Sequence, residues 1–373
     1  MDLKINKDSF TKALQRLSSV VAKGTTMPIL ANVLLTATAG KGLVLSATDL
    51  AIACVVPVGV CDVLTPGTIT IDFKNFYSVI KNLPGETLSL KTGDTEATAS
   101  RLIVKAGKAE FKLVGIDATD YPKMPDPTDA AFIDIDATAF EDMIQKTLFS
   151  ASQDETRSHL CGCLLVGKDG TLRMVSTDGH RLSMVTRTVA GAELFAGTGS
   201  IVPRKGLLEI QKLLDSVEGA VSIALRGSNL YVRGGGVRLS VKLLDAQFPD
   251  YFQVIPSNSS LSAKINRQAF VSALKRVSLL SSDASWGVKF QFTENTLMLS
   301  SAQHDFGEGS EELSIEYSGK PVQIGFNASY LQESLNATTA AEVYLRMNDE
   351  ISPGVLVPVD DPAYTCVVMP LRL

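Results

Sequence analysis

The sequence is poor in the residues that metal and redox sites require. It has five cysteines and three scattered histidines, His159, His180 and His304, with no CxxC pair or HxxxH grouping at ligand spacing. The odd cysteine count and the missing pairs predict buried, reduced thiols and argue against a disulfide framework or a zinc site. No metal or other cofactor is expected.

Long apolar runs and an excess of positive charge are also missing. No stretch approaches the roughly 18 apolar residues of a membrane span. Residues 1–6 alternate charged with apolar side chains, unlike the continuous apolar core of a signal peptide. We therefore expect a cytoplasmic protein with no membrane partner. The net charge of −5 argues against a chain coated in nucleic acid but allows a basic surface confined to one face.

What the sequence does contain is a threefold repeat. An isoleucine before a polar cap residue, a phenylalanine and a further apolar residue recur at intervals of 130 residues: Ile5, Phe10 and Leu14; Ile135, Phe140 and Ile144; Ile265, Phe270 and Leu274. Each set predicts an extended entry followed by the apolar face of a helix. Three copies at one fixed interval predict three homologous domains.

Each copy continues with the same order of elements. First strands are expected at 29–35, 160–166 and 288–292, and second helices at 73–83, 204–214 and 328–336. The fold class predicted is α+β, with two helices packed on one side of antiparallel sheet in each domain. Proline-rich joints near residues 127 and 256 divide the chain into domains 1–127, 128–256 and 257–373.

One stretch concentrates reactive side chains. Ser176, Asp178 and His180 lie at the end of an apolar strand, and Asp178-Gly179 indicates a tight turn. A hydrolase would need the three side chains to converge in space, whereas neighbours on a strand point to opposite faces. A strand-to-turn corner and an enzyme that uses these three residues are both open at this point.

Two glycine-containing segments imitate nucleotide loops. Residues 162–168 have the spacing of a phosphate-binding loop, but Asp169 stands where Ser or Thr would meet magnesium, and apolar strand residues fill the interior. Gly234-Gly235-Gly236 is better explained as a hairpin turn. No nucleotide site is expected in either segment.

Basic side chains recur on the polar faces of the expected helices. They are Lys12, Arg16, Lys74, Lys81, Lys146, Arg204, Lys205, Lys212, Lys275 and Arg276. Singly they are ordinary solvated residues, but their repetition in an acidic protein indicates one positive face, which would attract phosphates without reading bases. The helix expected at 328–336 has no Lys or Arg.

Several motifs resemble those of the bacterial DNA sliding clamps, the beta subunits of DNA polymerase III. In order they are Thr177 to Leu182, Val202 to Gly206, Phe248 to Tyr251 and the terminal Val368 to Leu373, set within repeats that span the chain. The resemblance implies the DNA clamp fold, in which a head-to-tail homodimer closes a ring of six domains around duplex DNA. It also implies a processivity factor without catalytic activity, which needs a separate ATP-driven loader.

The resemblance also implies site residues. A groove would bind short linear motifs of polymerases, the clamp loader and repair proteins, with an arginine at its rim. Its first subsite would contain Leu160, Thr177, Gly179, His180, Arg181, Leu182, Pro249, Val254, Val367 and Met369. Its second would contain Asn327, Tyr330, Ile351, Met369, Pro370, Leu371 and Arg372.

Two further surfaces follow from the same resemblance. The residues facing DNA would be Lys12, Arg16, Lys74, Lys81, Gln153, Ser158, His159, Arg204 and Lys205. Ser158 and His159 stand where tyrosines can touch DNA in this family, so aromatic stacking is in doubt there. Phe111 against Leu279 and Leu280 would form the dimer contact, although the two leucines equally fit a plain core.

Overall fold

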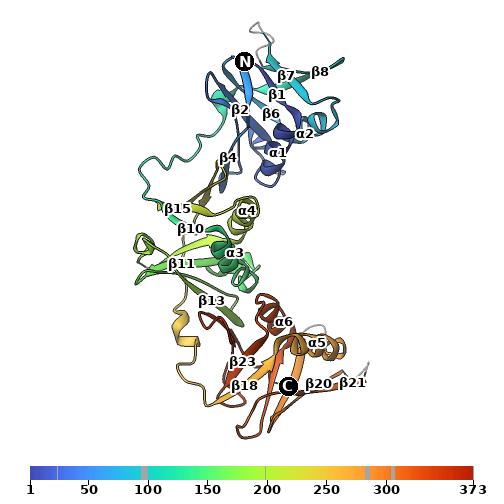
Figure 1. Cartoon of the computed structure of the whole chain (residues 1–373), viewed down its shortest axis with the longest axis vertical. Helices are drawn as coiled ribbons and strands as arrows, with labels where there is room; N and C mark the ends of the chain where they lie inside the picture. Colours follow the sequence, from blue (N-terminus) through green and yellow to red (C-terminus); the bar gives the residue numbers. More distant parts are fainter. Residues whose placement is uncertain (23, 94–99, 198, 282–285, 304–306, 373) are drawn as a thin grey trace. The chain divides into compact units, whose positions relative to one another are not determined.

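The computed structural model describes residues 1–22, 24–93, 100–197, 199–281, 286–303 and 307–372 (Figure 1). His304 and Leu373 lie outside the described residues. The chain divides into two compact units. The first unit is Met1–Ala137 with Lys205–Leu243, and the second is Thr138–Arg204 with Leu244–Leu373.

One antiparallel sheet organises the first unit. In spatial order its described strands are β10 (Ile133–Asp136), β15 (Ala220–Arg226), β16 (Asn229–Gly234), β17 (Val237–Lys242), β4 (Ile52–Pro57), β3 (Gly42–Thr48), β2 (Asn32–Thr38), β6 (Gly67–Asp72), β9 (Ala109–Ile116), β8 (Arg101–Ala106), β7 (Thr87–Thr92), β1 (Asp2–Asn6) and β5 (Cys61–Thr65). The strand pairing β17 to β4 joins the second repeat to the first.

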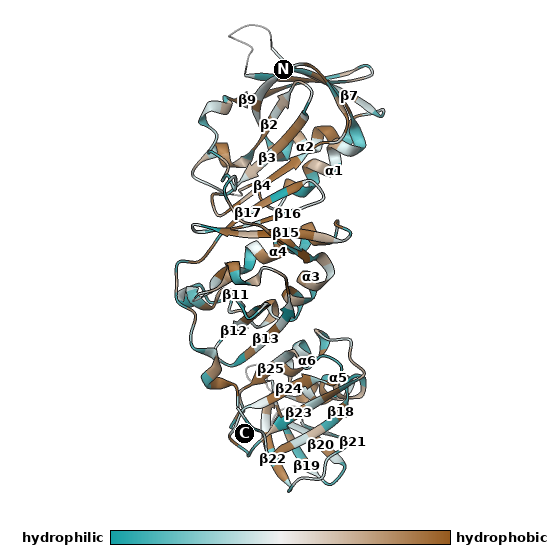
Figure 2. Ribbon diagram, turned by 60° about the vertical axis from the view of Figure 1, so that its left-hand side comes forward, coloured by the Kyte–Doolittle hydropathy of each residue, from teal (hydrophilic) through white to brown (hydrophobic). Residues whose placement is uncertain are grey.

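The helices of the first unit are α1 (Lys7–Leu17), α2 (Phe73–Asn82) and α4 (Arg204–Leu214), whose first residue belongs to the second unit. Asn6 caps α1 by accepting from the Ser9 backbone N–H, because an amide side chain satisfies a free donor of the first turn. Phe10 and Phe76 meet edge to face at 5.7 Å between α1 and α2. Apolar residues dominate β3 and β4, which α1 covers (Figure 2).

Two antiparallel sheets organise the second unit. The first has the described order β14 (Ser200–Pro203), β11 (Gly162–Lys168), β12 (Thr171–Thr177), β13 (Arg181–Thr188), β25 (Tyr364–Val368), β24 (Gly354–Pro358), β23 (Glu342–Met347) and β18 (Leu261–Asn266). The other has the order β21 (Gly307–Ser314), β20 (Thr296–Gln303), β19 (Gly287–Thr293) and β22 (Val322–Asn327). The pairing of β13 with β25 joins the second repeat to the third.

The helices of the second unit are α3 (Ala137–Gln145), whose first residue belongs to the first unit, α5 (Arg267–Val277) and α6 (Ala328–Asn336). Asn266 and Asn327 cap α5 and α6 through their side-chain oxygens. The α5 and α6 helices contact each other, and Phe270 on α5 packs edge to face on Phe290 of β19 at 6.1 Å. The predicted α+β fold with helices on antiparallel sheet is therefore confirmed.

Some sequence expectations differ from the structure. The strand expected from residue 29 begins only at Asn32, because Pro28–Ala31 forms a 3-10 turn, η1, with proline at its first position. The strand expected from Leu160 begins at Gly162, since Leu160 ends the 3-10 segment η4, Glu155–Leu160. The domain boundaries at residues 127 and 256 stay a prediction. No helix among the described residues is long and apolar enough to cross a membrane.

The cysteines are free thiols, but not all are buried as expected. Cys54, Cys163 and Cys366 are buried, whereas Cys61 and Cys161 are partly exposed. Burial raises the pKa of both Cys54 and Cys163 to about 12. The buried thiols therefore stay protonated and unreactive near neutral pH.

Candidate functional site

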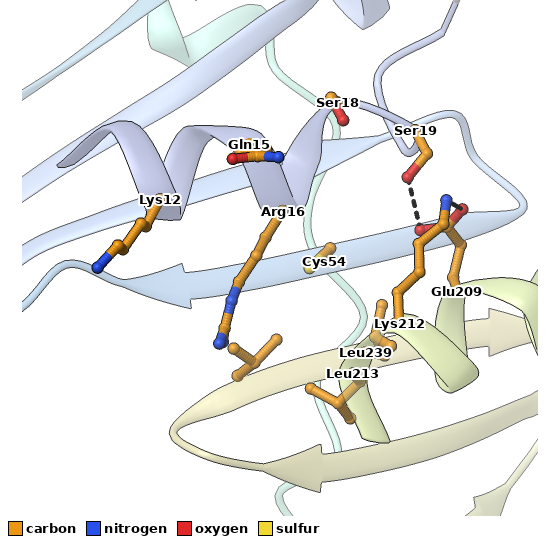
Figure 3. Close-up of a pocket in the computed structure, with 11 residues that line it drawn as sticks. Lys12, Gln15, Arg16, Ser18, Ser19, Cys54, Glu209, Lys212, Leu213 and Leu239 are labelled. Carbon is orange, nitrogen blue, oxygen red and sulfur yellow. Dashed lines mark hydrogen bonds and ion pairs between the residues drawn. The ribbon is translucent and has the colours of Figure 1, made fainter. Parts of the chain in front are cut away.

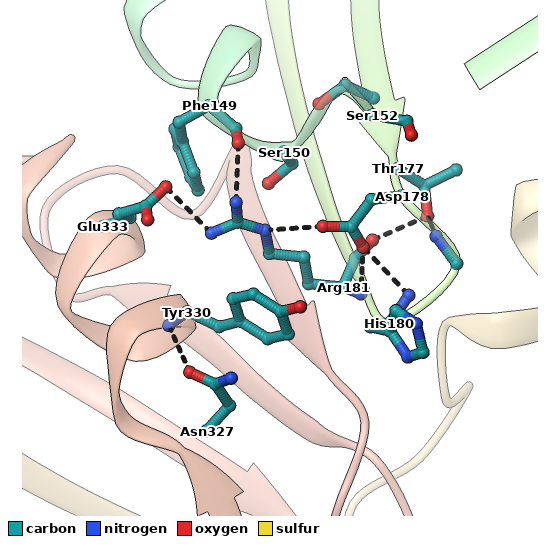
Figure 4. Close-up of polar contacts among 12 residues, drawn as sticks. Phe149, Ser150, Ser152, Thr177, Asp178, His180, Arg181, Asn327, Tyr330 and Glu333 are labelled. Carbon is teal, nitrogen blue, oxygen red and sulfur yellow. Dashed lines mark hydrogen bonds and ion pairs between the residues drawn. The ribbon is translucent and has the colours of Figure 1, made fainter. Parts of the chain in front are cut away.

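The corner between β12 and β13 is held by its own side chains (Figure 4). Thr177 Oγ1 donates to the carbonyl oxygen of Arg181 at 2.6 Å and accepts from the Gly179 N–H at 3.1 Å. Asp178 Oδ1 accepts from the backbone N–H groups of His180 at 2.9 Å and Arg181 at 3.0 Å. Gly179 has φ +91°, in the left-handed region that favours glycine. The sequence thus encodes a fixed turn at this point.

A cavity of about 290 Å³ lies against this corner. Its lining combines apolar side chains with a few polar groups: His159, Leu160, Thr177, Gly179, Arg181, Leu182, Pro249, Asp250, Tyr251, Val254, Val367 and Met369. The structure therefore brings together the whole predicted first subsite except His180. The His180 side chain is exposed, and its backbone carbonyl oxygen accepts from the Met369 N–H at 2.9 Å.

An apolar cluster forms the floor of this cavity. Leu182 and Val367 come from the paired strands β13 and β25, and Tyr251 comes from the 3-10 turn η6, Tyr251–Val254. Phe248 packs on Tyr251 edge to face at 6.4 Å. The proline-rich joint is therefore a wall of the cavity as well as a connection between repeats.

Arg181 is buried, with 9% of its surface exposed, and does not stand at the rim as predicted. Its Nε donates to Asp178 Oδ2 at 3.1 Å, Nη1 to Glu333 Oε2 at 3.0 Å and Nη2 to the Phe149 carbonyl at 2.7 Å. The Cζ atom also lies 4.4 Å from the centroid of the Tyr330 ring. Because these contacts occupy the guanidinium, Arg181 shapes the cavity from behind.

The residues of the predicted second subsite lie near α6 and the chain end. Asn327 caps α6 through the Tyr330 N–H at 3.2 Å, and the Tyr330 ring lies on Arg181. Leu371 bridges to Gly325, its N–H donating to the carbonyl at 2.8 Å. Ile351 is 78% exposed, and Pro370 and Arg372 extend the same terminal segment. Arg181 therefore contacts Tyr330 of the second subsite while lining the first.

The geometry is wrong for a hydrolase that uses Ser176, Asp178 and His180. Ser176 is fully buried, and its Oγ donates to the Thr147 carbonyl oxygen at 2.5 Å. The Asp178 carboxylate binds Arg181 and two backbone N–H groups. Nucleophile, base and orienting acid thus do not converge, and the strand-to-turn interpretation holds.

Most of the predicted DNA-facing residues are exposed. Lys12 and Arg16 on α1, Lys74 and Lys81 on α2, and Lys205 on α4 are in this group, together with Gln153 and Ser158. Lys205 forms an ion pair with Asp49. Arg204 is half-buried, with Nη1 donating to the Leu148 carbonyl at 2.8 Å, and half-buried His159 lines the cavity.

Two other helical cations are not free, as the sequence pattern had suggested. Lys146 is buried, and its Nζ lies 2.7 Å from carboxylate oxygens of both Asp142 and Asp361. Arg276 makes two bonds to Glu311, with Nε donating at 2.8 Å. Both side chains therefore serve internal ion pairs, and sequence periodicity had no means of identifying their partners.

The predicted dimer-contact residues are exposed to different degrees. Phe111 on β9 is 43% exposed, and Leu279 in the 3-10 turn η7, Ser278–Leu280, is 77% exposed. Leu280 is only half-buried. The alternative that both leucines belong to a plain core is therefore wrong for Leu279.

Sequence reasoning missed several residues around the cavity. Asp250 and Tyr251 line it, and Glu333 and Phe149 hold Arg181. The signal for the first two was present, since Phe248 to Tyr251 is one of the distinctive motifs. Glu333 carried no local signal, because its partner lies 152 positions away.

Known proteins match the chain over its whole length. Three family models match: DNA polymerase III beta subunit, N-terminal domain, over residues 1–125, central domain over 134–250 and C-terminal domain over 252–372. A beta sliding clamp of Pseudomonas putida is 34% identical over 373 residues, covering 100% of both chains. The crystal structure of the DNA polymerase III subunit beta from Pseudomonas aeruginosa has a TM-score of 0.92 at 32% identity, covering 100% of both chains. That of the Bacillus subtilis sliding clamp has a TM-score of 0.94 at 25% identity, covering 100% of this chain and 99% of that one.

Proposed function

The chain belongs to the family of DNA polymerase III beta subunits, the bacterial sliding clamps, and we propose that it works in the cytoplasm as a head-to-tail homodimeric ring on duplex DNA. The family is a non-catalytic processivity subunit of the polymerase. The cavity beside the Thr177 to Leu182 corner carries the rest of the proposal. It binds short linear motifs of polymerases, the clamp loader and repair proteins.

The composition of the cavity supports peptide binding. Leu160, Leu182, Val254 and Val367 offer an apolar slot for aliphatic or aromatic anchors, which supply most of the energy in such interfaces. Backbone groups of the corner and of the terminal segment from Met369 onward would bind the peptide backbone. The second subsite, near Tyr330 and Ile351, would receive the residues that precede or follow the anchors.

A truncation at the mouth of the groove tests this proposal. Met369 lines the cavity and is 40% exposed, so Met369→Ala removes anchor contact with little effect on the core. We expect about tenfold weaker binding of a labelled peptide with leucine and phenylalanine anchors, measured by fluorescence anisotropy. Leu64→Ala, at an exposed apolar residue of the first unit, is the control and should bind as the parent does. Equal affinity of the parent and Met369→Ala would exclude this groove.

The helical cations support sequence-independent contact with DNA. The exposed Lys12, Arg16, Lys74 and Lys81 present long, flexible cations on two adjoining helices of the first unit. Such cations attract phosphates through a salt-sensitive field and leave base edges unread, which permits sliding. Gln153, Ser158, His159, Arg204 and Lys205 would add weaker or water-mediated contacts.

Open sheet edges support closure of the ring. Residues 109–114 of β9 pair with β8 on one side, and no described strand pairs with them on the other. The β21 strand ends its sheet in the described part of the chain. The β9 edge carries Lys112 and Phe111, whereas β21 carries the exposed Glu308 and Glu312. Pairing β9 of one copy with β21 of the next would satisfy both edges and bring Phe111 to Leu279 and Leu280.

Retention on circular DNA tests the ring. The protein, placed by its loader on a circular duplex, should stay bound through gel filtration in high salt, because a closed ring is held by topology and not by charge. Cutting the circle once should release it. Retention that persists after the cut would show ordinary binding and contradict the ring.

A further inference from the structure

The first unit contains a cavity of about 460 Å³ between α1, α4 and the strand β17 (Figure 3). Lys12 and Arg16 reach into its lining from α1, where residues four apart share one face. Val237 and Leu239 of β17 form an apolar part of the wall. The cavity is therefore open space with two cationic side chains beside it.

The charges around this space do not cancel. Glu209 is 6% exposed, and its carboxylate accepts from Ser19 Oγ at 2.8 Å and pairs with Lys212 Nζ at 2.8 Å. Neither Lys12 nor Arg16 forms an ion pair with any residue that the structure describes. Glu209 is thus already neutralised by Lys212, and two cations remain without an anion.

The next repeat shows what such a place holds when it is filled. Arg16 corresponds to Lys146 and Lys12 to Asp142, 130 residues further on. Lys146 Nζ lies 2.7 Å from Asp142 Oδ1 and 2.7 Å from Asp361 Oδ2. The helix thus supplies one acid itself, and the strand end beyond it supplies a second.

The register of the strands identifies what the first unit lacks. Cys54 pairs with Leu239 and its counterpart Ser183 with Cys366, so Val237 stands in the place of Tyr364. Three residues earlier, Gly234 stands in the place of Asp361. Tyr364 is fully buried against Lys146, whose Nζ lies 5.4 Å from the ring centroid. The first unit therefore has a smaller side chain and no carboxylate at the corresponding positions.

We propose that this cavity binds a phosphoryl group, with Arg16 and Lys12 as its cationic ligands. The guanidinium of Arg16 offers a planar pair of donors that matches two phosphate oxygens, and the Lys12 ammonium adds a mobile charge. Ser18 and Gln15 line the same space and provide further polar groups. The group is either free phosphate or a backbone phosphate of DNA. This site goes beyond ring formation and motif binding and can fail while both stand.

Titration with inorganic phosphate tests the site. Phosphate is added to the full-length protein at constant ionic strength set with chloride, and binding is followed by calorimetry and by the phosphorus NMR line width. We expect saturation at one phosphate per chain and at least tenfold weaker binding in Arg16→Gln. Lys81→Gln removes the same charge from an exposed position on α2 outside the cavity and should bind as the parent does.

A second variant and a competition distinguish the remaining outcomes. Val237→Tyr places the larger side chain of the second unit in the cavity and should weaken phosphate binding without changing any charge. Displacement of phosphate by a short duplex would identify the backbone as the source, and no displacement would identify free phosphate; both keep the site. Absence of saturation in the parent protein, or equal losses in Arg16→Gln and Lys81→Gln, would overturn it.

Discussion

The two repeat corners, Thr48 to Ile52 in the first unit and Thr177 to Arg181 in the second, share one hydrogen-bond scheme. Thr48 Oγ1 donates to the Ile52 carbonyl at 2.8 Å, and Asp49 Oδ1 accepts from the Ala51 and Ile52 N–H groups at 3.0 and 2.7 Å. The later corner makes the same bonds. A threonine followed by aspartate is therefore sufficient for the shape of the turn.

The corners differ in the residues that this scheme does not use. Ile52 ends the first corner as a buried apolar side chain, whereas Arg181 ends the second and binds Glu333 of α6. Glu209 of α4 is the counterpart of Glu333 and accepts from a serine, Ser19. One scaffold thus carries an apolar residue in the first unit and a buried cation in the second.

The comparison teaches where specialisation entered the repeats. The second corner joins a groove to α6 through Arg181, and the ion cluster of Lys146 and Asp361 strengthens the same unit. The first unit keeps open space and unpaired cations at the corresponding positions. Substitutions that exchange these features should therefore have opposite or unequal effects in the two units.

The largest effect is expected from Arg181→Ile, which installs the residue of the first corner in the second. It leaves Glu333 and the Phe149 carbonyl without their donor, so we expect a loss of about 3 kcal/mol in the free energy of unfolding. Urea denaturation measures this loss. Arg181→Lys keeps the charge without the planar fork and should recover only part of the stability. Parent-like stability of Arg181→Ile would show that the contacts to α6 are unimportant.

A smaller loss, about 2 kcal/mol, is expected for Asp361→Asn. Burial alone would raise the pKa of Asp361, but hydrogen bonds from Arg187 and Lys146 outweigh it and hold the pKa below its usual range. A depressed carboxyl pKa contributes stability that is present above the unfolded pKa of about 3.9 and disappears as pH falls through the lower folded value.

The pH dependence is the sharper test of Asp361→Asn. The stability difference from the parent should be constant between about pH 5 and 8 and shrink below about pH 4, as the parent carboxylate becomes protonated. Urea denaturation at a series of pH values measures it. Asp49→Asn is the matched control, because the Lys205 partner of Asp49 is 54% exposed in its side chain and such pairs contribute little. A difference that persists unchanged at pH 3 would contradict the ionic origin.

The sequence was sufficient for elements and repeats because these depend on local pattern. The apolar spacing of Phe10, Leu14 and Leu17 predicted a helix whose buried face is made of those residues. The α4 and α6 helices have the predicted bounds, since their cap residues and apolar faces lie within one short window. Residues near Thr177 were assigned to a groove only through the resemblance to sliding clamps.

The partners of charged side chains could not be predicted from the sequence. Lys146 and Arg276 fitted a solvated helical face, but Asp361 and Glu311 arrive from strands elsewhere in the chain. Arg181 fitted a groove rim, but α6 covers its guanidinium. Burial of a cation depends on tertiary neighbours, so periodicity alone assigns such residues to solvent.

The smallest effect is expected from exchanging the third residue of each corner. Leu50 has φ +73° and is 55% exposed, so the first corner holds a leucine in a backbone region that favours glycine. Leu50→Gly relieves this strain but adds freedom to the unfolded chain, and we expect a net gain of about 0.5 kcal/mol. Gly179→Leu introduces the strain in the second corner and should lose about 1 kcal/mol. Thermal unfolding measures both changes, and shifts of the same sign would show that the two corners do not share one backbone requirement.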